Sequence, residues 1–171
     1  MVTVVRRRPV IGVMGPGRAT RVQLRSAMAL GEGIARNGWV LLTGGRAAGV
    51  MDAVNRGAKR VPGSLTIGVL PTASTRVSRF VDVAIVTDMG NARNNVNVLS
   101  SDVVVACGPG GLGTISEVAL ALKARKPVIL LGGDPLEEKM FTKLGGGLVR
   151  SARTPQAVVD MIRRHLNRRK A

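Results

Sequence analysis

The chain has 171 residues, enough for one well-buried domain, and 45% of them are hydrophobic although only 2% are aromatic. One cysteine and one histidine exclude a disulfide framework, a cysteine-based zinc site and catalysis that needs several imidazoles. The formal net charge of +16 suits a phosphate-rich partner, but the basic residues are scattered and base-stacking aromatic residues are scarce, so we expect no specific nucleic-acid site.

The first half of the chain alternates short apolar runs with helical patterns. Residues 10–13 form the first predicted strand, and the helix that follows carries apolar residues at the 3.6-residue period until Asn37-Gly38 ends it. Residues 39–43 form the second strand, and a second helix covers residues 50–60. This alternation is typical of strand–helix–strand units with parallel strands.

The pattern continues through the second half. Residues 65–70 and 82–87 form the third and fourth predicted strands, and residues 90–101 form a short helix with Asn91 as its expected N-cap. The fifth strand covers residues 102–107, and a glycine-rich turn leads from it into the next helix.

A sixth strand is predicted over residues 126–133, and the last helix starts at Thr154-Pro155, a cap followed by a first-turn proline. Strands without strict alternation of apolar and polar residues indicate a parallel sheet that is covered on both faces. We therefore predict an α/β fold of one domain over residues 1–171, a doubly wound, mainly parallel, Rossmann-like sheet flanked by helices. Basic tails cover residues 1–8 and 167–171.

Three glycine-rich turns follow predicted strands, at residues 12–17, 43–51 and 107–114. In a parallel sheet they lie together at the carboxyl edge, where backbone amides and helix N-termini bind phosphate. Arg18 and Arg46, in the first two of these turns, either pair with phosphate or are solvated. The residues expected to bind the ligand are Gly15, Gly17, Arg18, Gly44, Gly45, Arg46, Gly49, Gly108, Gly110, Gly111, Gly113 and Thr114.

Two common ligand classes do not match these turns. A dinucleotide site needs an acidic residue at the end of the second strand, but that strand ends in Thr43-Gly44-Gly45. A P-loop needs a lysine before its Ser or Thr, but Gly113 is followed directly by Thr114. The turns therefore favour a monophosphate compound bound by backbone amides.

Arg93 and Glu117 each have two interpretations. Thr114-x-x-Glu117 has the spacing of a helix capping box, and Arg93 suits a surface ion pair. Placed together beside a phosphate cradle, the carboxylate and the guanidinium would instead bind a ribose or polarise a glycosidic bond.

The segment "PGGLGTISE" at residues 109–117 resembles the PGGxGTxxE signature of the lysine-decarboxylase-like group, which includes the Lonely Guy phosphoribohydrolases. This resemblance implies Arg93 and Glu117 as catalytic residues of a nucleoside 5'-monophosphate phosphoribohydrolase. Those enzymes carry a lysine after the arginine, whereas Arg93 is followed here by Asn94.

A closer resemblance is to the molybdenum cofactor carrier proteins. It rests on "IGVMGPGRAT" (11–20), "NGWVLLTGGRAAGVMDAVNRGAK" (37–59), "TIGVLP" (66–71), "IVTDMGNARNNVNVLSSDVVVACG" (85–108) and "EVALALKARKPVILLG" (117–132). It implies a homo-oligomer, a dimer or tetramer, that binds molybdopterin cofactor and protects or delivers it without a reaction of its own. No protein-bound metal is implied, because the molybdenum arrives inside the cofactor.

The N-terminal segment lacks the features of a signal peptide, and no apolar stretch reaches the length of a membrane span. We therefore expect a cytoplasmic protein that does not associate with membranes.

Overall fold

The computed structural model describes residues 7–108 and 111–168. Most of the predicted basic tails, residues 1–8 and 167–171, lies outside the described residues. Seven strands form one sheet, and every pair of neighbours is parallel. The strands are β1 (Val10–Met14), β2 (Val40–Thr43), β3 (Thr66–Leu70), β4 (Val83–Val86), β5 (Val103–Cys107), β6 (Val128–Leu131) and β7 (Val149–Ala152).

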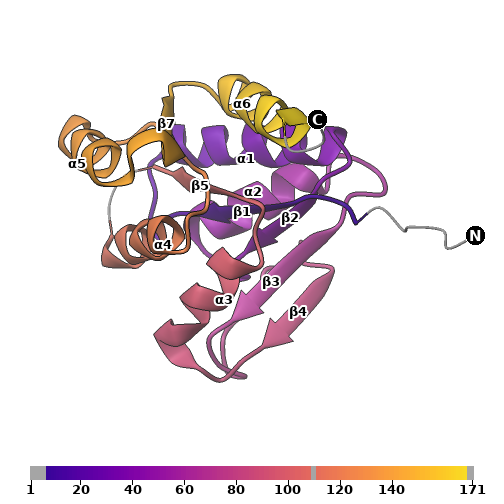
Figure 1. The fold of residues 1–171 in the computed structure, drawn as a ribbon. Helices are drawn as coiled ribbons and strands as arrows, with labels where there is room; N and C mark the ends of the chain where they lie inside the picture. The colour runs from indigo at the N-terminus through magenta and orange to yellow at the C-terminus, as the bar shows by residue number, and fades with distance from the viewer. Residues whose placement is uncertain (1–6, 109–110, 169–171) are drawn as a thin grey trace, which may run out of the picture.

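The sheet order is β4-β3-β2-β1-β5-β6-β7, so β1 and β5 lie side by side at its centre (Figure 1). From β1 the chain winds outward towards β4, and from β5 it winds outward in the other direction. The carboxyl ends of β1 and β5 therefore form the point where the strand order reverses, and open α/β sheets bind ligands at such points.

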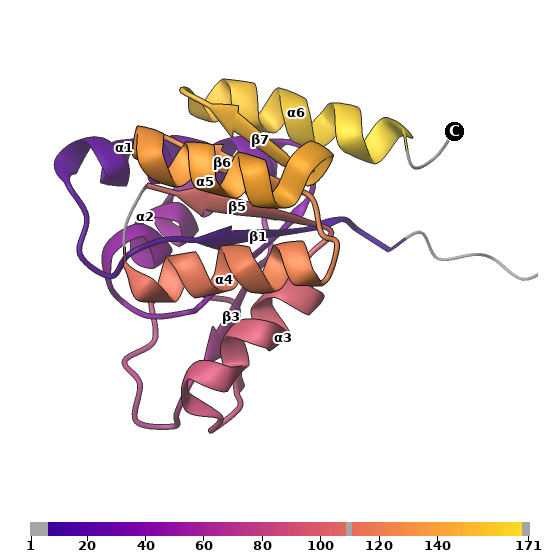
Figure 2. The same ribbon diagram turned by 60° about the vertical axis from the view of Figure 1, so that its left-hand side comes forward.

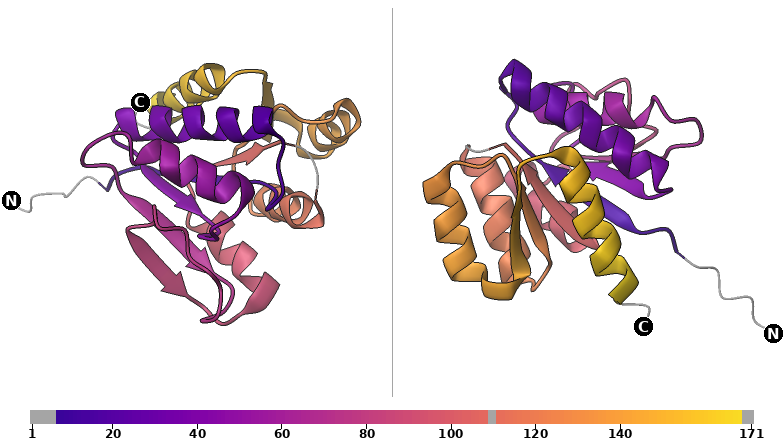
Figure 3. Two further views of the ribbon diagram at one scale, coloured as in Figure 1. Left: turned by 180° about the vertical axis from the view of Figure 1, so that it is seen from behind. Right: turned by 90° about the horizontal axis from the view of Figure 1, so that it is seen from above.

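Helices cover both faces of the sheet and make it a three-layer fold (Figures 2 and 3). Helices α1, α2 and α6 pack on one face, and α3, α4 and α5 pack on the other. The central strands are buried on both faces, which explains their continuous apolar sequences. The helices are α1 (Arg21–Arg36), α2 (Gly49–Ala58), α3 (Arg93–Leu99), α4 (Leu112–Lys123), α5 (Pro135–Gly145) and α6 (Pro155–Arg168).

The predicted Rossmann-like α/β class is confirmed, but two elements were not predicted. Strand β7 was not predicted because two polar residues, the exposed Arg150 and the half-buried Ser151, interrupt its apolar run. Helix α5 begins with Asp134, whose side chain accepts a hydrogen bond from the Leu136 N–H, and with Pro135 in its first turn. Only Phe141 of this helix is fully buried, so its apolar periodicity is weak.

The prediction of Asn91 as an N-cap is wrong. Asn91 lies inside a short 3-10 turn, Gly90–Ala92, and α3 starts at Arg93 without a side-chain cap. The Asn91 side chain is therefore available to the cavity described next.

Candidate ligand-binding site

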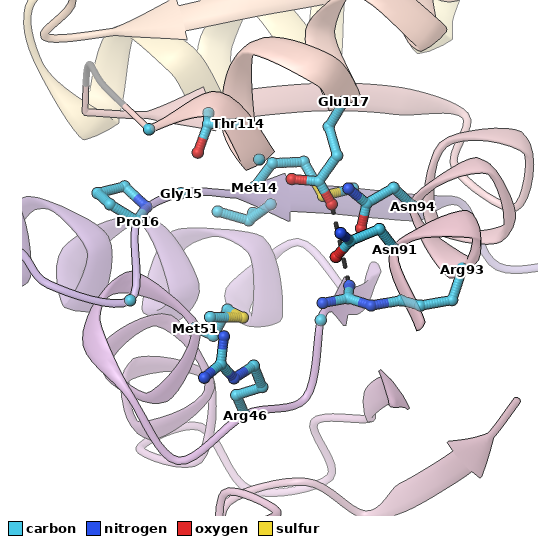
Figure 4. Close-up of a pocket in the computed structure, with 15 residues that line it drawn as sticks. Met14, Gly15, Pro16, Arg46, Met51, Asn91, Arg93, Asn94, Thr114 and Glu117 are labelled. Carbon is cyan, nitrogen blue, oxygen red and sulfur yellow. Dashed lines mark ion pairs between the residues drawn. The ribbon is translucent and has the colours of Figure 1, made fainter. Parts of the chain in front are cut away.

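The three glycine-rich turns meet at the carboxyl edge of the sheet, at the point where the strand order reverses. Together with the start of α3 they enclose a cavity of about 230 Å³ (Figure 4). Polar and charged side chains come from both halves of the sheet. The cavity is lined by Val13, Met14, Gly15, Pro16, Gly17, Gly44, Arg46, Met51, Asn91, Arg93, Asn94, Gly111, Gly113, Thr114 and Glu117.

Of the eleven predicted ligand-binding residues that the structure describes, seven line this cavity and four do not. Those in the lining are Gly15, Gly17, Gly44, Arg46, Gly111, Gly113 and Thr114. Arg18 and Gly49 lie in a neighbouring groove between the starts of α1 and α2, Gly45 is buried against β3, and Gly108 packs against Gln23. Gly110 lies outside the described residues. Ligand contact by any of the twelve predicted residues stays a prediction.

The first two turns are packed directly on each other. The Val50 N–H donates a hydrogen bond of 3.1 Å to the Pro16 carbonyl oxygen, which joins the start of α2 to the turn after β1. Gly49 has a φ of 52°, and a side chain there would overlap the backbone of Pro16 and Gly17. Glycine is therefore required at residue 49 to bring the two turns together.

The N-terminus of α4 opens towards the cavity. Gly111 is its N-cap and contributes no side chain, and the first helical hydrogen bond runs from the Ile115 N–H to the Gly111 carbonyl oxygen. The N–H groups of Leu112, Gly113 and Thr114 precede it and have no partner within the helix. They carry the positive end of the helix dipole, which suits an anion.

The capping-box interpretation of Thr114 and Glu117 is wrong. Helix α4 begins two residues before Thr114, so Glu117 lies in its second turn and cannot reach an N-cap. The Asn97 side-chain amide instead donates a 3.1 Å hydrogen bond to Glu117 Oε1. Glu117 therefore connects α4 to α3 at the cavity wall.

Arg93 and Glu117 form a buried ion pair rather than a surface one. Arg93 Nη1 lies 3.9 Å from Glu117 Oε1, and only 8% of Arg93 and 7% of Glu117 are exposed. The guanidinium lies over Gly44, where an added Cβ would be 2.6 Å from Nη1. The missing side chain at residue 44 thus makes room for Arg93 in the cavity wall.

Burial acts on both members of the pair. It raises the pKa of Glu117, while the hydrogen bond from Asn97 and the charge of Arg93 oppose the rise. Burial likewise lowers the pKa of Arg93, although the guanidinium remains protonated. Arg93 Nε and Nη1 are buried and have no hydrogen-bond partner among the described residues. An anionic ligand in the cavity would supply the missing acceptors.

The raised pKa of Glu117 gives a testable pH dependence. The folded state favours the protonated carboxyl, so this contribution to stability is present at acidic pH and is lost as pH rises through the folded-state pKa. We expect the free energy of unfolding of the wild type, measured relative to Glu117→Gln, to fall as pH rises above 4.5, the ordinary value. Denaturant titrations between pH 4 and pH 8 measure this difference.

Asp82→Asn is the control, because its effect on stability should change with pH in the opposite direction. Burial raises the pKa of Asp82, but hydrogen bonds from Lys59 and Thr66 outweigh it and lower the pKa overall. The stability gained from Asp82 should therefore be lost as pH falls. The stability difference between the wild type and Glu117→Gln should change with pH in the opposite direction to the Asp82→Asn difference. A difference that does not change with pH, or that changes in the same direction, would contradict the raised pKa of Glu117.

Sequence reasoning missed the asparagines of the site. Asn91 and Asn94 line the cavity, and Asn97 holds Glu117. Their three-residue spacing places all three amides on one side of the segment. Asparagine is disfavoured in helix interiors, so this three-residue repeat is the sequence signal that could have identified these residues as part of the site. Met14 and Met51 also line the cavity and had no such signal.

Three further features are a possible metal site, the single cysteine and a possible membrane-spanning helix. In the described part of the chain no three His, Cys, Asp or Glu side chains lie together as a metal site would need. Cys107 is buried at the end of β5, and burial raises its thiol pKa to about 12. None of the helices within residues 7–108 and 111–168 combines the length and apolar character needed to cross a bilayer.

A family model matches residues 8–159, almost the whole of the fold described above. The chain belongs to the SLOG cluster4 family. The chain is also 35% identical, over 98 residues, to the cytokinin riboside 5'-monophosphate phosphoribohydrolase of Mycobacterium tuberculosis. That match covers 56% of this chain and 51% of the enzyme.

Two solved structures match this chain over nearly their full length. The molybdenum cofactor binding protein of Rippkaea orientalis is 55% identical, with a TM-score of 0.90. The molybdenum cofactor carrier protein of Chlamydomonas reinhardtii is 50% identical, also with a TM-score of 0.90. Each match covers 94% of this chain and 99% of the other.

Proposed function

We propose that this SLOG cluster4 protein binds the molybdenum cofactor, a phosphorylated pterin, and carries or protects it in the cytoplasm. The observation that carries the proposal is the convergence of three glycine-rich turns and two arginines on one cavity. The likeness to cofactor-binding proteins of the same length and fold supports the same ligand class.

Each part of the cavity suits a part of that ligand. The N–H groups of Gly113 and Thr114, which have no partner within the helix, and the guanidinium groups of Arg46 and Arg93 match the charge of a phosphate. The side-chain amides of the lining asparagines donate and accept hydrogen bonds, as the edge of a pterin ring requires. Met14 and Met51 offer polarisable apolar surface to the ring itself. Binding needs no metal ligand from the protein.

Co-elution with the cofactor tests this proposal. Purified protein is mixed with isolated molybdenum cofactor and passed through a gel-filtration column, and molybdenum and pterin are quantified in the protein peak. We expect both to elute with the protein at a constant ratio. Elution of the cofactor only in the small-molecule volume would contradict carriage.

A second candidate is hydrolysis of a nucleoside 5'-monophosphate. It is favoured by the buried Arg93–Glu117 pair in the cavity wall, the pair that the Lonely Guy resemblance implies as catalytic. In that reaction water adds to C1' of the ribose, the N-glycosidic bond breaks, and the base leaves with a proton. Glu117 would hold the ribose hydroxyls or act as the acid and base.

Incubation with AMP and related monophosphates separates the two functions. Release of free base that stops in Glu117→Ala and Arg93→Ala would support the hydrolase and contradict a carrier without a reaction. Base release no faster than in buffer, together with co-elution of the molybdenum cofactor, would exclude hydrolysis as the function.

We also propose that the chain forms a homo-oligomer through the outer face of α3 and α4. These helices pack on each other beside the cavity (Figure 2). Leu112 and Leu99 are exposed there, and a shallow groove runs between Asn91 and Lys123. An apolar, grooved helix face is typical of surfaces that become buried on association.

We expect Leu112→Glu to shift the protein towards monomer, because association would bury the new charge. Leu136→Glu is the matched control, since Leu112 and Leu136 lie in the first turns of α4 and α5 and are 85% and 76% exposed. Light scattering after gel filtration measures the mass. Equal behaviour of the two variants would show that the α3–α4 face is not the interface.

A further inference from the structure

A second cavity lies at the opposite edge of the sheet, where β5, β6 and β7 begin. Its volume is about 500 Å³, and it reaches from the end of α4 to α6 (these elements are labelled in Figure 2). None of its residues lines the cavity at the carboxyl edge. It is lined by Asp102, Val103, Ala124, Arg125, Lys126, Pro127, Val128, Ile129, Gly147, Leu148, Arg150, Met161 and His165.

The single acidic side chain in this lining is already occupied. Asp102 accepts a 2.6 Å hydrogen bond from Arg7 Nη2 and forms an ion pair with it. Lys126 Nζ donates to the carbonyl oxygens of Leu99 and Ser101, at 3.0 Å and 2.8 Å, which fixes its charge beside the cavity. The cavity therefore presents a net positive charge to any ligand.

Two guanidinium groups remain available to such a ligand. Arg125 follows α4 and Arg150 lies on β7, and both side chains are exposed. Neither makes a hydrogen bond or ion pair with a side chain or backbone group in residues 7–108 or 111–168. Two unpaired arginines at one cavity suit the bidentate binding of phosphate oxygens.

The backbone of Arg125 gives an independent observation. The N–H groups of Arg125 and Lys126 donate to the carbonyl oxygens of Leu122 and Ala121, at 3.0 Å and 2.9 Å, and close α4 with a Schellman motif. Arg125 occupies the left-handed position of this motif, with a φ of 54°, where glycine is usual. An arginine in a position that disfavours its Cβ indicates a function for the side chain.

We propose that this cavity binds an organic phosphate in which phosphate groups are joined to an apolar or planar body, as in a nucleoside diphosphate. Arg125 and Arg150 bind the phosphate groups. Pro127, Leu148 and Met161, which share the lining, provide the apolar surface for the body. The site is separate from the cofactor cavity and does not depend on the function of that cavity.

Titration calorimetry with ADP tests the site through Arg125→Gly. This variant removes the guanidinium and places the preferred residue at the left-handed position. We expect ADP to bind about tenfold more weakly, while the free energy of unfolding stays the same or rises. Weaker binding therefore cannot be attributed to a damaged fold. Unchanged affinity for ADP, or no binding by the wild type, would overturn the proposal.

Three comparisons locate the binding. Lys139→Ala removes one exposed charge from α5, outside both cavities, and should leave the affinity for ADP within twofold. Arg93→Ala should also leave it unchanged, so a loss in this variant would assign ADP to the cofactor cavity. Pyrophosphate and adenosine should each bind more weakly than ADP. Equal affinity for pyrophosphate would contradict a role for the apolar surface.

Discussion

We expect Arg93→Ala to weaken binding of the molybdenum cofactor, the ligand proposed for this cavity, by about 100-fold, and Arg93→Lys to recover only part of the loss. The guanidinium is buried in the cavity wall with Nε and Nη1 unpartnered among the described residues. A hydrogen bond to a charged group contributes about 1.5 to 3 kcal/mol, so two of them at the lower end of this range account for about 3 kcal/mol, or about 100-fold. Lysine supplies the charge but not the planar pair of donors. Titration calorimetry with the isolated cofactor measures the change.

The control must separate a ligand contact from a structural role, because Arg93→Ala also leaves Glu117 buried without its cation. The double variant Arg93→Ala/Glu117→Gln removes the unpaired charge. We expect it to recover most of the free energy of unfolding lost in Arg93→Ala, but none of the affinity. Affinity that returns together with stability would show that Arg93 serves only as the counterion of Glu117.

The fold was predictable because its signals are local. Each central strand is an apolar run followed by glycine, and the helices show the 3.6-residue period. Strand β7 was not predictable, because Arg150 faces solvent at the edge of the sheet and breaks the apolar run. The prediction therefore failed where polar residues interrupt the strand, whereas the other edge strand, β4, is exposed but entirely apolar and was predicted.

The location of the site was also predictable, since parallel strands bring the three turns to one edge. The contacts between side chains within the site were not predictable. Glu117 and Asn97 are 20 residues apart, and the bond between them depends on the packing of α3 against α4. Sequence spacing favoured a cap by Thr114 because a capping box is a local motif, whereas the contact that Glu117 makes is tertiary.

The largest effect on stability is expected at the crossing of α1 and α2. A methyl group at Gly31 would overlap the carbonyl oxygen of Val54, and one at Gly57 would overlap the carbonyl oxygen of Met28. The obstacle in both cases is helix backbone, which no change of rotamer can move. We expect Gly31→Ala to lower the free energy of unfolding by about 3 kcal/mol, although alanine favours an isolated helix. Denaturant titration measures the loss.

Gly33→Ala, in the same helix, is the matched control. A methyl group there would meet the side chain of Val159, with Cγ2 at 2.8 Å, and no backbone atom, so we expect a change within about 1 kcal/mol. Equal losses in the two variants would show that helix α1 as a whole, and not the crossing, responds to alanine.

The packing of α1 against α2 should also affect the cavity. Helix α1 begins at Arg21, shortly after the first glycine-rich turn, and α2 begins at Gly49 within the second; the Val50–Pro16 hydrogen bond joins the two turns. Forcing the helices apart should separate these turns, so Gly31→Ala should weaken cofactor binding under conditions where the protein remains folded. Because residue 31 lies outside the cavity lining, unchanged affinity would mean that the two turns keep their positions independently of the helices that follow them.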